Sequence, residues 1–225
     1  MAGRNLIFAD GQYYHIFNRG IARQPVFFTK RDYERFILTF NYYRYINPPL
    51  KLSRFLQTSL VKRIKLMESL NNSSQLIDIL CFVLMPNHFH YLLKQNIVNG
   101  ISIFMSKTIN SYTKYINTKQ ERVGDLFQGV FKAVHIESDE QLIHVSRYIH
   151  LNPVTSHLVS SAKISSYCWS SYRDYLKGKS KSLQMDPVLS LFKSNREFEQ
   201  FVLDQADFQQ KLDEISHLTL EDKLK

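Results

Sequence analysis

Hydrophobic positions along the chain follow two periods, and each change of period marks a predicted element. Short runs rich in aromatic and β-branched residues, typical of strands, cover 13–18, 77–84, 88–93 and 131–136. Between these runs, apolar residues recur every three or four positions, as they do on one face of a helix. This spacing predicts helices from about Thr29, from Ile101 to Ile116 and from Ser138 to Pro153.

Residues that favour helix ends support these boundaries. Thr29 followed by Asp32, and Ser138 followed by Gln141, have the spacing of a capping box, in which side chains accept hydrogen bonds from the first free N–H groups of a helix. Pro153 has no N–H to donate and disfavours the helical conformation of the residue before it. We therefore expect the last of these helices to end at Pro153.

The predicted elements follow one another as strand, helix, insert, strand, strand, helix, strand, helix. This order predicts an α+β fold, a ferredoxin-like antiparallel sheet with packed helices. The insert, about 50–72, has apolar residues at helical spacing with Lys and Arg between them, and we interpret 51–70 as one basic helix or two. Composition changes after residue 153. We expect one domain at 1–153, then an aromatic and basic linker and a helical extension at 154–225, with 187–214 helical.

The chain is basic. It has 29 Lys and Arg against 20 Asp and Glu, a formal net charge of +9. This charge favours a polyanionic partner, and nucleic acid is the leading candidate. The 13 Tyr and 16 Phe would suit stacking on bases, but for most of them a place in the hydrophobic core is the simpler interpretation.

Cysteine content and hydropathy indicate a reducing compartment. The two cysteines, Cys81 and Cys168, offer neither a disulfide framework nor a Cys-rich zinc pattern. The first ten residues lack the apolar centre of a signal peptide, and the longest apolar run, 79–86, is too short to span a bilayer. We therefore expect a soluble, cytoplasmic protein without a membrane partner.

The most informative motif is a pair of histidines in one predicted strand. His88 and His90 are two positions apart, so in a β-strand both imidazoles lie on the same face. Both can then bind one metal ion. From the spacing alone, a hydrogen-bonded or solvated pair is the commoner outcome, and both interpretations stay open.

A second group of polar side chains lies about sixty residues later. Tyr148 and Asn152 are four positions apart, so the phenol and the carboxamide share one helix face. Together with the two histidines, the Asn152 oxygen would bind a divalent metal ion beside Tyr148, which would act as the nucleophile. His144, one turn before Tyr148, is a candidate assisting base. Ordinary packing of a tyrosine and an asparagine near a helix end would explain the same residues.

Five motifs in order resemble the REP-associated tyrosine transposases, a branch of the HUH-type single-tyrosine endonucleases related to small bacterial insertion-sequence transposases. They lie at 14–20 (YHIFNRG), 85–90 (MPNHFH), 126–129 (LFQG), 148–153 (YIHLNP) and 169–172 (WSSY). The resemblance runs from about Tyr13 to Tyr175. It implies a ferredoxin-like domain, in agreement with the order of the predicted elements.

The resemblance also implies roles for the singled-out residues. It implies that His88, His90 and Asn152 bind a magnesium or manganese ion and that Tyr148 is the nucleophile. Members of the family cut single-stranded DNA near a hairpin and leave a 5′-phosphotyrosine and a free 3′ hydroxyl. Two positions depart from the family pattern: a basic residue and a proline of the relatives are replaced by Val130 and Cys168.

We therefore expect a transposase-type endonuclease and strand transferase that acts on hairpin-bearing single-stranded DNA at the nucleoid. Charge near the motifs points to phosphate contacts at Arg19, Lys30, Arg31, Lys132 and Arg147. Two alternatives stay open: a catalytically idle protein that binds DNA hairpins, and a metal phosphodiesterase in which water is the nucleophile. A homodimer also stays open, since related transposases can work as dimers.

Overall fold

Four strands form one antiparallel sheet. The computed structural model describes residues 6–204. Its strands pair in the order β2-β3-β1-β4, with β1 at Tyr13–Arg19, β2 at Ile77–Met85, β3 at His88–Gln95 and β4 at Lys132–Ile136. One connection with a helix follows β1 and another follows β3. This topology is ferredoxin-like and confirms the predicted fold class.

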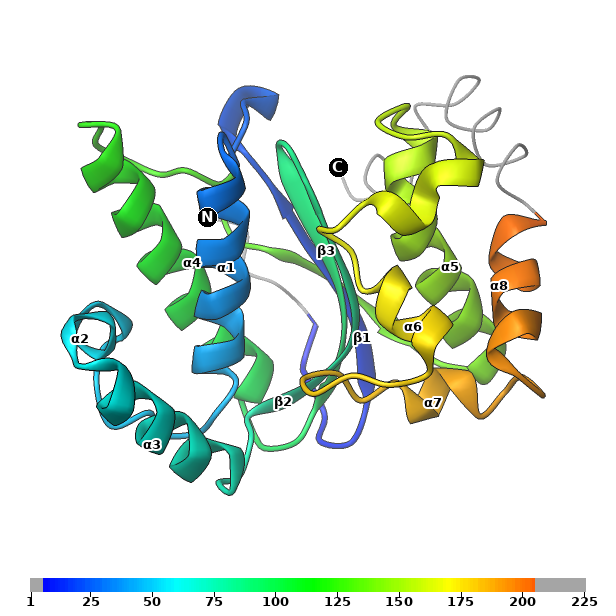
Figure 1. Ribbon diagram of the computed structural model, residues 1–225, viewed down its shortest axis with the longest axis horizontal. Helices are drawn as coiled ribbons and strands as arrows, with labels where there is room; N and C mark the ends of the chain where they lie inside the picture. The colour runs from blue at the N-terminus through cyan, green and yellow to red at the C-terminus, as the bar shows by residue number, and fades with distance from the viewer. Residues whose placement is uncertain (1–5, 205–225) are drawn as a thin grey trace.

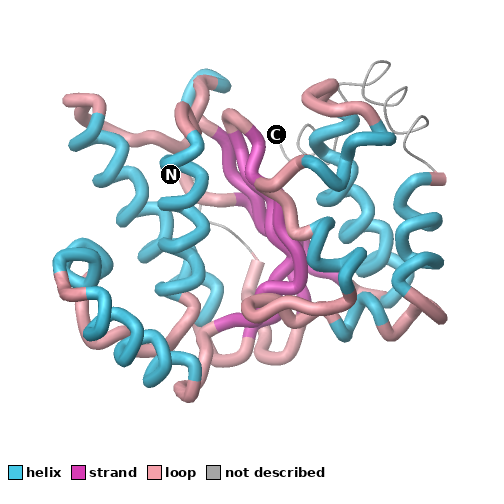
Figure 2. The backbone as a smooth tube through the Cα atoms, in the orientation of Figure 1, coloured by secondary structure: helices cyan, strands magenta, loops and turns pink. Residues whose placement is uncertain are grey.

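Helices cover both faces of the sheet (Figures 1 and 2). The helices α1 (Lys30–Tyr43) and α4 (Gly100–Lys119) lie together on one side, and α5 (Asp139–Thr155) lies on the other, against β2 and β3. The described residues also form several shorter elements: η1 (Ile21–Arg23), η2 (Ser161–Ser166), α6 (Tyr172–Lys177), α7 (Asp186–Leu189) and α8 (Asn195–Leu203). Within residues 6–204, no helix is both long and apolar enough to cross a membrane.

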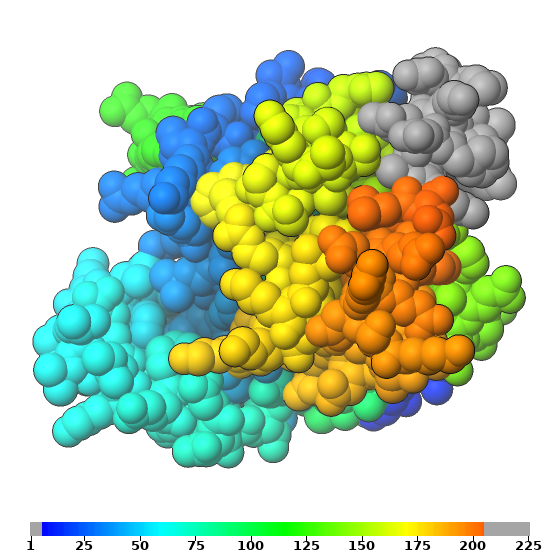
Figure 3. Space-filling model, turned by 45° about the vertical axis from the view of Figure 1, so that its right-hand side comes forward, coloured from blue at the N-terminus to red at the C-terminus, as the bar shows by residue number. Residues whose placement is uncertain are grey.

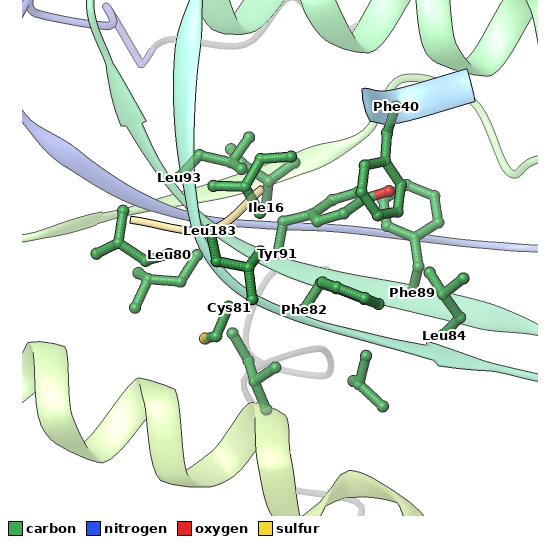
Figure 4. Close-up of a cluster of buried hydrophobic side chains, with 14 of the residues drawn as sticks. Ile16, Phe40, Leu80, Cys81, Phe82, Leu84, Phe89, Tyr91, Leu93 and Leu183 are labelled. Carbon is green, nitrogen blue, oxygen red and sulfur yellow. The ribbon is translucent and has the colours of Figure 1, made fainter. Parts of the chain in front are cut away.

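Aromatic side chains fix α1 on the sheet. The ring centroids of Phe36 and Phe89 lie 5.3 Å apart, and those of Phe40 and Tyr91 lie 5.5 Å apart. All four side chains are fully buried, and Figure 4 shows Phe40 reaching toward Phe89 and Tyr91 of the sheet. Buried rings of this size provide much of the apolar area that stabilises a domain of this kind.

The basic insert folds as two helices, α2 (Leu52–Gln57) and α3 (Leu60–Asn71), which agrees with the second of the two interpretations. The Ser59 side chain accepts a hydrogen bond from the Lys62 N–H and so caps the start of α3. A second, smaller hydrophobic cluster holds the insert against the end of α1; it consists of Tyr42, Tyr45, Leu52, Phe55 and Leu70.

Both predicted helix starts are confirmed, but one predicted end is wrong. Thr29 and Asp32 form a complete capping box at α1, and the Ser138 hydroxyl accepts a hydrogen bond from the Gln141 N–H at α5. The helix α5 does not end at Pro153; it continues to Thr155. Pro153 lies in the last turn, where its missing N–H removes only one helical hydrogen bond. Residues 151–155 are all buried, so tertiary packing outweighs the local preference.

The described part of the C-terminal segment shares the core of the sheet. Within the described part of the expected helix, 187–204, there are instead two helices, α7 and α8, and the Ser194 side chain caps the start of the second by accepting from the Glu197 N–H. Residues from 205 onward lie outside the described range. Ser170 pairs with Val83 of β2, and Figure 3 shows the segment after α5, in yellow, lying between α1 and α8. The domain division at residue 153 stays a prediction.

Candidate active site

The two histidines begin β3, directly after a tight turn. The strands β2 and β3 form a hairpin in which Met85 pairs with His88, so that Pro86 and Asn87 make the turn. His88 and His90 alternate with the buried Phe89. Because neighbouring strand residues point to opposite faces, both histidines lie on one face of the sheet, and their ring centroids are 5.1 Å apart.

The helix α5 brings the second polar group onto that face. Asn152 Oδ1 lies 3.1 Å from His88 Nε2. The Tyr148 ring meets the His90 ring edge to face, with centroids 5.4 Å apart. Tyr148 and Asn152 are one helical turn apart, and the structure therefore places the four residues that the sequence singles out in one cluster.

Asn87 fixes the orientation and the tautomer of His88. Its side-chain amide N–H donates to the Arg23 carbonyl at 3.1 Å, which leaves its Oδ1 to accept from His88 Nδ1 at 2.6 Å. This network assigns the proton of the neutral ring to Nδ1. His88 Nε2 therefore presents its electron pair to the Asn152 side chain.

A third histidine, His15 on β1, completes the cluster, and the sequence patterns assigned it no role. His15 Nε2 lies 2.9 Å from His90 Nδ1, and the two rings stack with centroids 5.1 Å apart. The His15 ring also lies edge-on to Tyr148, at 5.8 Å between centroids. The β1–β3 register pairs Phe17 with His90 and so places His15 on the same face, diagonally across. No spacing within the sequence predicts that register.

Burial keeps these imidazoles neutral at neutral pH. It lowers the pKa of His15 to about 3 and the pKa of His88 to about 4. The pKa of His90 is held well below its usual value by burial and, next, by the neighbouring His88 and His15. The neutral ring is the form of histidine that binds a metal ion.

The family model described as "Transposase IS200 like" matches residues 9–152. The chain belongs to this family of transposases. The matched range contains every residue of the cluster, from His15 on β1 to Asn152 on α5.

Among solved structures, this IS200-like transposase is similar to a REP-associated tyrosine transposase bound to a REP hairpin. The TM-score is 0.54 at 16% sequence identity, over 79% of this chain and 87% of that chain. This likeness supports the fold. A second solved structure, tRNA(His) guanylyltransferase from Saccharomyces cerevisiae, matches with a TM-score of 0.32 at 12% identity, over 90% of this chain and 80% of that chain. This similarity is too weak to support a shared fold. No curated protein matches the sequence.

The donor set of this transposase fits a divalent metal ion. His88 Nε2 and Asn152 Oδ1 lie 3.1 Å apart, and both are electron-pair donors that one cation could bind together. Among residues 6–204, no three His, Cys, Asp or Glu side chains form a group that could hold a metal ion. The amide of Asn152 is therefore needed beside the imidazoles, and a set with two nitrogens suits manganese better than magnesium.

His144 and Arg147 lie at the junction of α5 with α8. The Arg147 guanidinium donates to His144 Nδ1 at 2.6 Å and lies 4.3 Å from the centroid of the Phe201 ring. Arg147 is only 5% exposed. These contacts are enough to explain the positions of both side chains without a role in catalysis or DNA binding. Their roles as assisting base and phosphate contact stay predictions.

The other predicted phosphate contacts are spread over the molecule. Arg19 pairs with His88 across β1 and β3, at the edge of the cluster. Lys132 is exposed at the start of β4. Lys30 and Arg31 begin α1, on the other side of the sheet. Arg19 is therefore the predicted phosphate contact that the structure places beside the histidines.

Proposed function

We propose that this IS200-like transposase is a metal-dependent endonuclease and strand transferase for single-stranded DNA. The observation that carries the proposal is the position of Tyr148, whose ring lies against His90 while Asn152, one turn further, meets His88. A tyrosine beside donors suited to a metal ion is the arrangement that covalent cleavage of a phosphodiester needs.

In the proposed reaction, the Tyr148 oxygen attacks the phosphorus of one phosphodiester. A bond forms between phosphorus and the tyrosine oxygen, and the bond from phosphorus to the 3′ oxygen breaks. The phenol loses its proton and the leaving 3′ oxygen gains one, which yields a 5′-phosphotyrosine and a free 3′ hydroxyl. Because the phosphotyrosine retains the bond energy, the 3′ hydroxyl of another strand can reverse the step and join new ends.

Three side chains would hold the metal ion: His88, His90 and Asn152. When bound, Mg²⁺ or Mn²⁺ would polarise the phosphodiester and favour the phenolate form of the tyrosine. Two further residues orient the ligands. Asn87 holds the His88 ring through Nδ1, and His15 contacts His90 through the corresponding nitrogen. We infer that His15 is a positioning residue.

The proposed substrate is single-stranded DNA that carries a hairpin. The similar solved transposase is bound to a REP hairpin, and the net charge of +9 suits a polyanion. Arg19, beside His88, and Lys132, exposed on β4, are the proposed phosphate contacts near the cluster. These positive charges would hold the DNA strand near the sheet face against which Tyr148 of α5 packs.

The proposal is tested by trapping the covalent intermediate. Purified protein is incubated with Mn²⁺ and end-labelled single-stranded DNA that carries hairpins from the flanks of its own gene, and is then denatured and separated on a gel. We expect a protein–DNA adduct from the wild type and none from Tyr148→Phe. Tyr13→Phe removes a hydroxyl at the start of β1 and is the matched control, which should form the adduct.

Two other results would contradict the proposed mechanism. Cleavage by Tyr148→Phe at the wild-type rate, without an adduct, would identify water as the nucleophile. Binding of hairpin DNA without cleavage by the wild type, with either metal ion, would indicate an idle hairpin-binding protein.

A further inference from the structure

A basic groove lies between α1, α4 and the insert. Its volume is about 1060 Å³, and its walls come from α1, the segment 48–51, the start of α2, and α4. Among the described residues, its lining contains no carboxylate and six cationic side chains: Arg31, Arg35, Lys51, Lys107, Lys114 and Lys119. Figure 1 shows α1, α2 and α4 on one side of the sheet and α5 on the other, so the sheet separates this groove from Tyr148.

Most of this positive charge has no counter-charge close by. Lys119 is neutralised by Asp32, with 2.6 Å between Nζ and Oδ1. For Lys107 and Lys114, no carboxylate in the described part of the chain lies within ion-pair distance. These two lysines are seven positions apart on α4 and so lie on one helix face, two turns from each other. Unpaired cations gathered in a concave surface attract a ligand with several negative charges.

Aromatic and polar side chains stand among the cations. The Arg35 guanidinium lies 4.9 Å from the centroid of the Tyr115 ring, and Tyr43 lines the groove at the end of α1. Groups that can hydrogen-bond line the α4 wall: Ser106, Asn110, Ser111 and Thr118. Rings for base stacking, placed between cations for phosphates, are the mixture found on surfaces that bind single-stranded nucleic acid.

Contacts beneath the groove fix its walls. The buried Asp32 carboxylate on α1 accepts hydrogen bonds from the Tyr115 hydroxyl at 3.0 Å and from Lys119 at 2.6 Å, both on α4. At the other end, the Tyr42 hydroxyl donates to the Leu50 carbonyl at 2.7 Å and holds the segment that leads into the insert. A groove that is already formed loses less conformational freedom on binding than a flexible one.

We propose that this groove binds a segment of single-stranded DNA that lies outside the phosphodiester being cleaved. The choice of DNA as the ligand rests on the proposed function. The groove would be a second DNA-binding site, on the opposite side of the sheet from Tyr148. A strand anchored there stays attached to the protein while the ends at the tyrosine are exchanged.

The test measures how binding depends on salt. All proteins carry Tyr148→Phe and are kept in EDTA, so that neither cleavage nor a metal ion contributes. The probe is a fluorescent oligothymidylate of about 16 nucleotides, the upper end of the site size of single-strand-binding folds, and it forms no hairpin. Fluorescence anisotropy gives the binding constant at several NaCl concentrations.

The test variant is Lys107→Gln with Lys114→Gln, which removes two cations from the α4 wall. Each lost phosphate contact on a single strand makes the slope of log K against log salt shallower by about 0.7, so we expect a change of about 1.4. The matched control is Lys62→Gln with Lys65→Gln. It removes the same charge from exposed positions of α3 outside the groove, and its slope should equal that of the parent protein.

An unchanged slope in the groove variant, or an equal change in the α3 control, would overturn the proposal. A second measurement needs no charge substitution: an oligonucleotide with bromodeoxyuridine is photocrosslinked, and the peptides are identified by mass spectrometry. Crosslinks at Tyr43 or Tyr115 support the groove, and crosslinks confined to other segments contradict it. Neither measurement depends on cleavage, so the adduct formed by the wild type reports separately on the proposed catalytic function.

Discussion

His15 Nε2 lies 2.9 Å from His90 Nδ1, across the pairing of β1 with β3, and both side chains are buried. This contact occupies the Nδ1 side of the His90 ring, so Nε2 is the nitrogen that would bind a metal ion. His88 is held in the same way through Nδ1, by Asn87. Each candidate metal ligand of the strand thus has its own orienting partner.

Replacing His15 by Ala should weaken Mn²⁺ binding by about 10- to 100-fold, the usual effect of losing a group that orients a metal ligand. His15→Gln keeps a polar group that can pair with His90 and should restore most of the affinity. Isothermal titration calorimetry of the metal-free protein measures both. His135 points to the opposite face of the sheet, so His135→Ala should bind like the wild type. Equal affinity of His15→Ala and the wild type would rule out the positioning role.

Two substitutions of Asn152 test whether metal binding needs the oxygen atom of its side chain or only the volume of that side chain. Asn152→Asp keeps an oxygen at the position that faces His88 and should keep Mn²⁺ binding. Asn152→Leu has a similar volume but no donor atom, and both metal binding and the covalent adduct should be lost. The electron paramagnetic resonance signal of free Mn²⁺ follows the binding, and a thermal melt of each variant checks folding. Normal Mn²⁺ binding by Asn152→Leu would show that the amide is not a ligand.

The stability of the metal-free protein should rise with pH between about 4 and 6.5. Burial lowers the pKa of His88 from its ordinary value of 6.5 to about 4, and it lowers the pKa values of His15 and His150 to about 3. In this window the unfolded chain binds more protons than the folded one. The free energy of unfolding therefore falls as the pH is lowered, by about 1.4 kcal/mol per pH unit for each such histidine.

Urea titrations in EDTA, at pH values from about 7 to about 4.5, measure this dependence. His150→Gln removes one of these buried histidines and should show a shallower dependence than the wild type. A free energy of unfolding that stays constant across this range would contradict the burial of neutral histidines.

The helix α8 should stabilise the whole domain. Phe198 on α8 is fully buried, and its ring centroid lies 4.9 Å from that of Tyr175 and 5.7 Å from that of His150. Phe198→Ala should lower the free energy of unfolding by about 3–5 kcal/mol. Phe201→Ala, a change at a half-buried position of the same helix, should have a smaller effect. Two separate unfolding transitions would instead show that the C-terminal segment folds independently of the sheet.

Local patterns in the sequence determined the elements and much of the candidate site. The period-two run around His88 and His90 is a strand property, and it required both rings to share a face once the strand formed. The spacing of Tyr148 and Asn152 likewise put both on one side of α5. Capping residues gave the starts of α1 and α5, because the hydrogen bonds of a capping box join residues only three positions apart.

Only the tertiary structure decided how these pieces meet. Pro153 stays inside α5 because burial of the last turn outweighs a local preference, and His15 reaches His90 because of the β1–β3 register. The basic groove unites cations from α1, the insert and α4, which no local spacing relates. Sequence periodicity determines which face of its own element a side chain occupies. The neighbour on that face depends on the packing of elements far apart in the chain, and that packing is set by the free energy of the whole core.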